Sequence, residues 1–288
     1  MSDTVLTQST AHKPPLVGRM VLVVVLAAVA GLMFGLDIGV ISGALGFITD
    51  EFHASETAQS WIVSSMMLGA AVGALCAGRT SSALGRRKSL TLSAFLFVLG
   101  ALACTFAQSV ALLIIGRAVL GLAIGIASYV APLYISEIAD EQRRGSLIAM
   151  YQLMITLGIL LAFISDALFS YSHAWRWMFG VVAIPGAFFL IGSFFLPDSP
   201  RWLMLQGRHR EAESTLAVLR SSPEHAHAEI NDIRAQLTQT QRGLSLFLEN
   251  PNFRRSVALG MGLQLVQQFT GMNVVLYYGP RIFGSAGF

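Results

Sequence analysis

Asp37 and Arg117 are charged residues inside otherwise apolar stretches, and both could take part in proton chemistry. Asp37 lies in the run FGLDIG, deep in the first apolar stretch, and Arg117 lies in IGR in the fourth. A carboxylate in such a place is costly unless it is paired, hydrated or protonated. Arginine stays charged and offers a planar fork that fits a carboxylate. We expect the two at comparable depths and predict that their pairing couples proton binding to movement; a purely structural ion pair is the alternative.

Neutral amide side chains gather in the last apolar stretch. Gln264, Gln267 and Gln268 are spaced so that they share one face of a helix. Gly271 and Pro280 predict a broken helix of the kind that lines a cavity. An amide both donates and accepts hydrogen bonds, so the group suits a polyhydroxyl ligand; hydrogen bonding between helices is the alternative. Further polar residues of this stretch are Thr270, Asn273, Tyr277 and Tyr278.

The elements that must position these residues are membrane spans. Of the 288 residues, 54% are hydrophobic and 12% are charged, whereas a soluble domain carries about 25% charged residues. The chain therefore has too few charges to cover a water-facing surface. A helix needs about 20 apolar residues to cross a bilayer. Seven stretches of about that length are predicted to be spans: 20–48, 59–76, 90–106, 110–136, 147–169, 177–196 and 257–283.

Basic residues predict the orientation of the spans, because cytoplasmic loops carry an excess of Lys and Arg. With the N-terminus in the cytoplasm, Arg176 and Arg281 lie outside, and Arg117 lies within a span. The remaining basic residues do not gather on one soluble face, so nucleic acid is not an expected partner. The sixteen on the cytoplasmic side are Lys13, Arg19, Arg79, Arg86, Arg87, Lys88, Arg143, Arg144, Arg201, Arg208, Arg210, Arg220, Arg234, Arg242, Arg254 and Arg255.

The spans and loops divide the chain into four parts. We predict a cytoplasmic tail at 1–19, a six-helix bundle at 20–196, a cytoplasmic helical linker at 197–256 and a seventh span at 257–288. Six spans, a charged connection and a further span are typical of transporters built from two six-helix halves. On that pattern five more spans are expected, so the chain is expected to be an incomplete fragment.

The linker is predicted to form short helices rather than an extended connection. Ser199 before Pro200, and Ser222 before Pro223, each combine a hydroxyl cap with a residue preset for the first turn of a helix. An apolar stripe at helical spacing follows. It consists of Ile230, Ile233 and Leu237.

Two loops on the cytoplasmic side carry charges that could form salt bridges and hold one closed state. One is the basic turn at 78–88, which contains Gly85 and Arg86. The other begins at Glu137 and continues to the pair 143–144. The alternative is that these loops only retain positive charge on the cytoplasmic side.

Several stretches of the chain resemble the sugar porters of the major facilitator superfamily. Among these, the resemblance is to the bacterial arabinose–proton and galactose–proton symporters. The motifs PDSPRWL and QQFTGMN carry the most specific part of the resemblance. It covers essentially the whole chain after the first twenty residues. The matching stretches are 34–43, 116–117, 131–137, 144–145, 151–158, 197–203 and 267–273.

The resemblance implies an all-α, multi-pass membrane protein. Its six-helix bundle would be the N-terminal half of a major facilitator fold, followed by a cytoplasmic helical connection and a seventh, discontinuous span. Asp37 would be the proton site and Arg117 its partner. The implied sugar contacts are Phe34, Gln152, Gln267, Gln268, Asn273 and Tyr278. The implied cytoplasmic gate consists of Gly85, Arg86, Glu137 and Arg144.

The function predicted from these features is secondary active transport of a monosaccharide, coupled to proton symport by alternating access. The expected partners are a pentose or hexose, a proton and the lipid bilayer. The expected location is the bacterial inner membrane, and the complete protein is expected to be a monomer. Facilitative relatives typically lack an acid at the position of Asp37, so its presence favours symport. A facilitative uniporter and a non-transporting sugar sensor on the same scaffold are the alternatives.

Other chemistry finds little support in the sequence. The predicted spans hold no nucleophile–base pair, so an enzyme is not expected. His209, His225 and His227 are poorly spaced for a metal site, and neither a metal nor a cofactor is predicted. Cys76 and Cys104 fall inside predicted spans and are interpreted as packing residues rather than as a disulfide.

Overall fold

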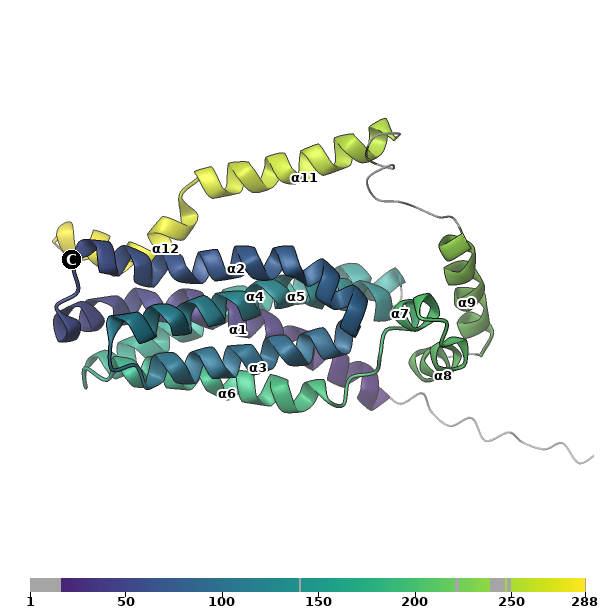
Figure 1. Cartoon of the computed structure of the whole chain (residues 1–288), viewed down its shortest axis with the longest axis horizontal. Helices are drawn as coiled ribbons and strands as arrows, with labels where there is room; N and C mark the ends of the chain where they lie inside the picture. Colours follow the sequence, from purple (N-terminus) through teal and green to yellow (C-terminus); the bar gives the residue numbers. More distant parts are fainter. Residues whose placement is uncertain (1–16, 140, 221–222, 239–246, 248–249, 288) are drawn as a thin grey trace, which may run out of the picture.

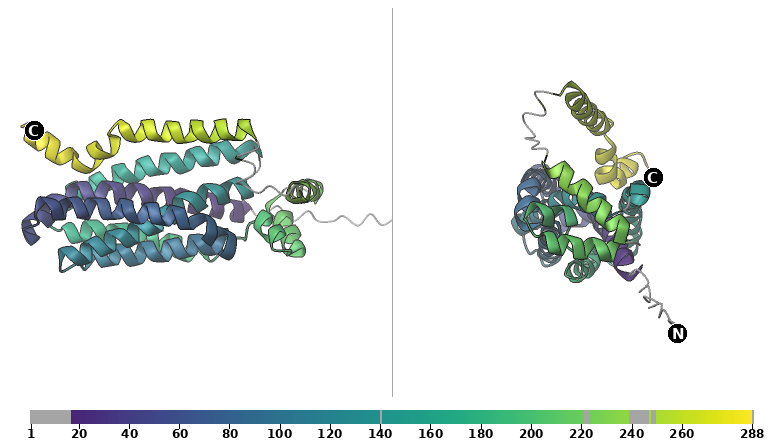
Figure 2. Two further views of the ribbon diagram at one scale, coloured as in Figure 1. Left: turned by 45° about the horizontal axis from the view of Figure 1, so that its top comes forward. Right: turned by 90° about the vertical axis from the view of Figure 1, so that its right-hand side faces the viewer.

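The chain folds into a bundle of long helices. Its computed structural model describes residues 17–139, 141–220, 223–238, 247 and 250–287. This described part contains helices and no strand, as expected for an all-α protein. Six helices run side by side along one axis (Figure 1 and Figure 2). They are α1 Val17–Phe52, α2 Glu56–Leu84, α3 Arg86–Thr105, α4 Val110–Ile138, α5 Glu141–Ser170 and α6 Trp175–Ser193.

All six of these helices are long and apolar enough to cross a membrane, and they coincide with the first six of the seven predicted stretches. α2 and α5 extend beyond the predicted stretches at both ends. The extension of α2 is explained locally, because the hydroxyl of Ser55 accepts a hydrogen bond from the backbone N–H of Ala58 and caps the first turn. The polar first turn of α2 thus belongs to the helix although it lies outside the apolar stretch.

Close helix packing within the bundle depends on glycine. A Cβ atom added at Gly35 of α1 would lie 1.9 Å from the carbonyl oxygen of Ile155 on α5. Between α4 and α2, a Cβ atom at Gly121 would lie 1.9 Å from the carbonyl oxygen of Met66. Backbones that approach this closely are characteristic of membrane helices, whose association relies on contact between surfaces rather than on a hydrophobic drive.

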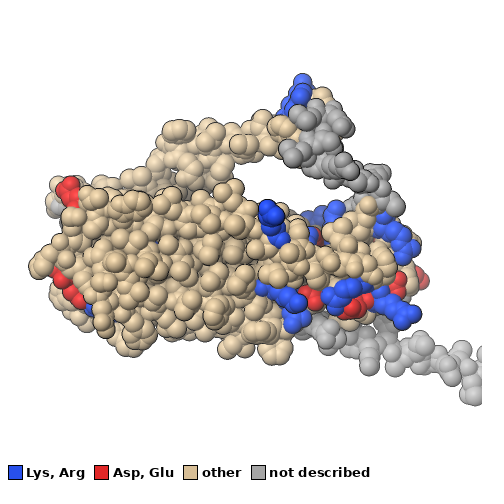
Figure 3. Space-filling model, in the orientation of Figure 1, with Lys and Arg blue, Asp and Glu red and all other residues tan. Residues whose placement is uncertain are grey.

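The bundle is apolar inside and outside. Large side chains such as Trp175, Phe97 and Phe189 fill its interior. Leu75, Leu168 and other large hydrophobic residues remain exposed on its surface. Figure 3 shows that charged residues gather at the two ends, with a broad uncharged belt between them. An apolar belt of this extent indicates a surface made for lipid.

Three short helices follow the bundle at the end where Lys and Arg residues gather (Figure 1 and Figure 3). They are α7 Pro200–Leu205, α8 His209–Leu219 and α9 Pro223–Thr238. Ser199 caps α7, as predicted, while Ser222 lies outside the described residues. Ile230 is buried with Trp202 and Leu216 in a small core that Ile233 and Leu237 cover, which confirms the predicted apolar stripe.

The seventh predicted span is present as two helices, α11 Pro251–Phe269 and α12 Met272–Ser285. The predicted break occurs at Gly271, whose φ of 72° lies in the left-handed region that glycine adopts readily. Pro280 does not break the helix, because α12 continues past it. Neither helix is long and apolar enough to count as a span on its own. No residue of α11 is buried, whereas Tyr277 of α12 packs against the bundle.

Candidate functional site

The bundle brings together the two charged residues singled out in the sequence. Nη1 of Arg117 on α4 donates a hydrogen bond of 2.9 Å to Oδ1 of Asp37 on α1. Both side chains are fully buried. The predicted pair therefore exists, and it joins two helices that are neighbours in the bundle although they are distant in the chain.

The ion pair is incompletely satisfied. Nε of Arg117 donates a long hydrogen bond of 3.4 Å to the carbonyl oxygen of Ile62 on α2. Oδ2 of Asp37 and Nη2 of Arg117 have no hydrogen-bond partner in the described part of the chain. A buried ionic pair is strongly favourable only when its remaining donors and acceptors are also satisfied. The open positions leave Asp37 able to accept a proton and Arg117 able to take another acceptor.

The predicted sugar contacts are brought together only in part. The side-chain amide of Asn273 on α12 donates a hydrogen bond of 2.9 Å to Oε1 of Gln268 on α11, so the two amides meet across the helix break. Gln267 and Gln268 are exposed. Gln152 is exposed on α5, and Phe34 is half-buried on α1. The amides of α11 therefore face open space rather than a closed site, because α11 packs no residue against the bundle.

A cavity of about 890 Å³ lies between α1, α5 and α12. Tyr277 and Tyr278 line it from α12, and Tyr278 is one of the predicted sugar contacts. Its size is within the range of small-molecule pockets, about 300–1,000 Å³. The cavity is therefore roomy enough for a monosaccharide.

Asp166 of α5 also lines this cavity, and the sequence analysis missed it. The residue is buried, and its Oδ2 accepts a hydrogen bond of 3.1 Å from the backbone N–H of Gly43 on α1. A signal was available, because Asp166 is an acidic residue inside the predicted span 147–169. The cost argument applied to Asp37 holds for it as well.

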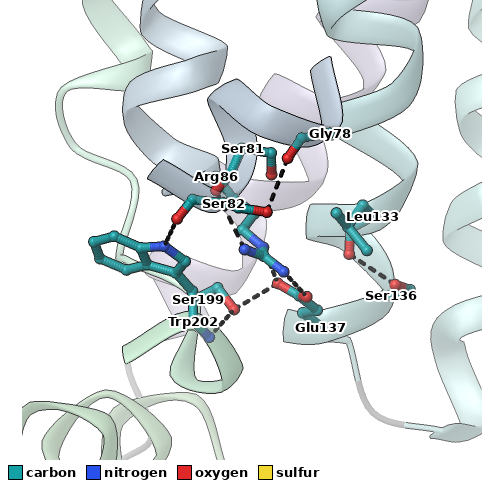
Figure 4. Close-up of polar contacts among 9 residues, drawn as sticks. All are labelled: Gly78, Ser81, Ser82, Arg86, Leu133, Ser136, Glu137, Ser199 and Trp202. Carbon is teal, nitrogen blue, oxygen red and sulfur yellow. Dashed lines mark hydrogen bonds and ion pairs between the residues drawn. The ribbon is translucent and has the colours of Figure 1, made fainter. Parts of the chain in front are cut away.

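The predicted cytoplasmic gate residues Arg86 and Glu137 form a second buried ion pair (Figure 4). Nε and Nη2 of Arg86 donate to the two carboxylate oxygens of Glu137, each at 2.7 Å. The hydroxyl of Ser199 donates to Oε2 of the same carboxylate at 2.6 Å. Glu137 therefore links the turn between α2 and α3 to α4 and to the start of α7.

Trp202 adds a further link at this end. Its indole N–H donates a hydrogen bond of 2.9 Å to the carbonyl oxygen of Ser82 (Figure 4). Gly85, predicted to belong to the gate, has a φ of 87° and lies against the indole ring, which a Cβ atom would approach to 3.0 Å. Glycine is required here both by the backbone conformation and by the contact.

Arg144 does not join this cluster. It is exposed, and no ion pair connects it to any residue that the structure describes. A different arginine, Arg220, ties the short helices to the bundle. It donates to both carboxylate oxygens of Glu229 and, at 2.9 Å, to the carbonyl oxygen of Ile138 at the end of α4. This contact could not be inferred from the sequence, because Arg220 is one of many arginines in the linker.

Comparison with known proteins agrees with this architecture. Residues 23–288 match the family described as sugar (and other) transporter. The chain belongs to this family. It is 60% identical over 264 residues to the arabinose-proton symporter of Escherichia coli, a match that covers 92% of the chain and 56% of the relative. It is 58% identical over 263 residues to the galactose-proton symporter of the same organism, covering 91% of the chain and 57% of the relative.

Solved structures give the same fold. The chain is similar to a proton:xylose symporter of the major facilitator superfamily, bound to 6-bromo-6-deoxy-D-glucose, with a TM-score of 0.82 and 29% identity. That similarity covers 92% of the chain and 62% of the symporter. The chain thus has the fold of a major facilitator transporter, and it spans somewhat more than half the length of the curated relatives it matches.

Proposed function

We propose that this chain provides the proton-coupling bundle of a monosaccharide–proton symporter that works by alternating access. The observation that carries the proposal is the fully buried Asp37–Arg117 pair, in which Oδ2 of Asp37 lacks a partner. The similarity to arabinose-proton and galactose-proton symporters supports the substrate class, a pentose or hexose. The working environment is the bacterial inner membrane, with the N-terminus and the α7–α9 end in the cytoplasm and the complete protein a monomer.

The coupling follows from the electrostatics of the pair. With Asp37 ionised, its attraction to Arg117 holds α1 against α4. A proton on Asp37 removes that attraction and frees α1 to move relative to α4. Release of the proton toward the other side of the membrane restores the pair. A proton gradient then biases the direction in which the two halves of the transporter rock.

Sugar binding is assigned to the residues on both sides of the Gly271 break. Gln268 and Asn273 already meet, and the tyrosines of α12 line a cavity of suitable size. Neutral amides can donate to and accept from sugar hydroxyls, and tyrosine rings can cover the apolar face of a sugar. Gln152 and Gln267 would complete the contacts when α11 is packed against the bundle.

The test replaces Asp37 by asparagine, which imitates the protonated carboxyl permanently. Because the relatives are longer, the chain is reconstituted in liposomes both alone and fused to the unmatched C-terminal part of the E. coli arabinose-proton symporter. In the fusion, Asp37→Asn should abolish sugar-driven proton uptake and uphill accumulation while sparing sugar binding and counterflow. Asp232→Asn, which changes an exposed carboxylate of α9, serves as the matched control and should behave like the unchanged fusion.

Each alternative predicts a different pattern. A uniporter shows counterflow without sugar-driven proton movement in the unchanged fusion. A sugar sensor binds sugar and shows no counterflow. A purely structural ion pair predicts that Asp37→Asn loses folding and sugar binding together. Sugar-driven proton movement that persists in a folded Asp37→Asn protein removes Asp37 from the mechanism.

A further inference from the structure

Asp166 is a second membrane carboxyl, and it is in a different situation from Asp37. The exposed fraction of the residue is 6%. Its Oδ2 accepts the backbone N–H of Gly43, and its Oδ1 is buried with no partner in the described part of the chain. Asp37 faces Arg117, whereas the described residues that line the cavity beside Asp166 include no Lys, Arg or His.

The position of Asp166 is set by the tightest kind of helix contact in the bundle. Along α1, Gly35, Gly39 and Gly43 recur every four residues and meet α5. A Cβ atom at Gly43 would lie 2.5 Å from the carboxyl group of Asp166. The carboxyl therefore occupies the space that a side chain at position 43 would need. Gly43 and Asp166 both line the cavity, so this contact lies where the α1–α5 interface meets it.

The surroundings of Asp166 do not favour a charged carboxylate. Among the residues whose side chains the structure describes, the titratable groups that line the cavity are Asp50 on α1 and Tyr277 and Tyr278 on α12, and none of these is a cation. One backbone N–H is too little compensation for an ionised carboxylate taken out of water. Water, a sugar hydroxyl or a hydrated cation could compensate it. Each would need access to Oδ1, which is closed off in this conformation.

A proton bound to Asp166 neutralises the carboxyl without any space for a water molecule or another group beside Oδ1. Two hydroxyl groups next in sequence to the contact, those of Ser42 and Ser165, are also buried without a partner in the described residues. A protonated carboxyl is neutral, so it can be buried beside the single backbone N–H of Gly43 at a lower cost than the ionised form. The ionised form, in contrast, requires cavity water to reach Oδ1, and that requires the ends of α1 and α5 to separate.

We propose that Asp166 is a second proton-binding site, at which a proton closes the cavity end of the α1–α5 interface. The proton passes to cavity water when the two helix ends separate, and a proton from the same water returns when they close. The inference rests on the membrane placement in the proposed function, but not on its sugar or on the role of Asp37. The inference about Asp166 and the proposed sugar–proton symport can therefore fail independently of each other.

Infrared difference spectroscopy tests the proton directly. The 288-residue chain in lipid nanodiscs is compared at neutral and alkaline pH. The unchanged chain should lose a protonated-carboxyl C=O band on going to alkaline pH, and Asp166→Asn should lack that band. Asp50→Asn, which changes the other carboxylate lining the cavity, and Asp37→Asn should retain it. The proposal is overturned if Asp166→Asn loses the same C=O band on going to alkaline pH as the unchanged chain does. It is also overturned if the unchanged chain has no carboxyl band that responds to pH.

Spin-label distances test the coupling to helix separation. Labels are placed at position 46 on α1 and position 168 on α5, with Cys76 and Cys104 replaced. Raising the pH should lengthen the distance in the otherwise unchanged chain and leave it short in Asp166→Asn, while Asp50→Asn should follow the unchanged chain. Asp166→Leu, a neutral variant that cannot accept from Gly43, is used if Asp166→Asn does not fold. A distance that does not respond to pH in the unchanged chain refutes the coupling whatever the variants do.

Discussion

Nη1 of Arg117 lies 2.9 Å from Oδ1 of Asp37, and neither side chain is reached by solvent. The pair joins α1 to α4 across 80 residues of sequence. Oδ2 of Asp37 and Nη2 of Arg117 have no hydrogen-bond partner in the described part of the chain. Protonation of Asp37 would weaken the attraction between the two side chains. The stability of the bundle should therefore depend on both partners together rather than on each alone.

Replacing Arg117 by methionine should destabilise the bundle strongly. The variant leaves the carboxylate of Asp37 buried without its cation, which costs about 3–5 kcal/mol when one partner of a buried pair is removed. The double variant Asp37→Asn with Arg117→Met should recover most of that loss, because no buried charge remains. The free energy of unfolding in mixed micelles, measured for a double-mutant cycle, checks this. Equal losses in the single and double variants would contradict it.

Adding one methyl group at Gly35 should disrupt the α1–α5 contact. The Cβ atom of Gly35→Ala would lie 1.9 Å from a backbone oxygen, which cannot move out of the way as a flexible side chain can. Overpacking of this kind costs about 1–3 kcal/mol, or more where backbone must shift. Gly46→Ala on the same helix is the matched control, because no atom lies within 4 Å of its Cβ position. Unfolding free energies that agree for the two variants would exclude close packing as the role of Gly35.

Much of the bundle could be predicted from the sequence, because the physics of spanning a membrane is local. Stretch length and composition identified α1 to α6, and Ser199 before Pro200 identified the start of α7. The comparable depths of Asp37 and Arg117 in their spans also agree with the pair that the structure shows. Each of these predictions uses information contained within a few turns of one helix or in the order of the spans.

Features that depend on which helices are neighbours could not be predicted in the same way. The sequence shows that Asp166 is an acidic residue inside a predicted span, but it does not show that Gly43 of α1 lies opposite it. Arg144 and Arg220 are both predicted from the sequence to lie in cytoplasmic connections, and only the path of α8 and α9 decides that Arg220 contacts the end of α4. The polar stretch around Gly271 was correctly predicted to break, but α11 lies apart from the bundle and leaves its amides exposed.

Replacing Glu137 by alanine should release α7 from the bundle. Glu137 accepts two hydrogen bonds from Arg86 and one from Ser199, and both charged side chains are at most 9% exposed. The change removes hydrogen bonds to a charged group, each worth about 1.5–3 kcal/mol. Faster proteolysis at the α7–α8 connection should follow.

The matched control for this prediction is Glu211→Ala. Glu211 pairs with Arg208 on the exposed surface of the same helical segment, and the hydrogen bond from Arg208 lowers the pKa of Glu211. That pair is open to solvent, so its loss should leave proteolysis unchanged. If both variants were cleaved at the same rate, Glu137 would not be the residue that fastens α7.

Replacing Gln267 by alanine should weaken sugar binding in the fusion with the C-terminal part of the arabinose-proton symporter. Loss of one hydrogen bond to an uncharged hydroxyl costs about 0.5–1.5 kcal/mol, which corresponds to a dissociation constant raised about 2- to 13-fold. The effect should be on affinity alone, because Gln267 has no contact with the Asp37–Arg117 pair, so the number of protons moved per sugar should stay the same. Equilibrium binding and sugar-driven proton uptake measure the two quantities separately. Leu259→Ala, which shortens an exposed side chain of the same helix, should leave the affinity unchanged. An unaltered affinity in Gln267→Ala would remove this amide from the binding site, and altered proton stoichiometry would show that binding and coupling share it.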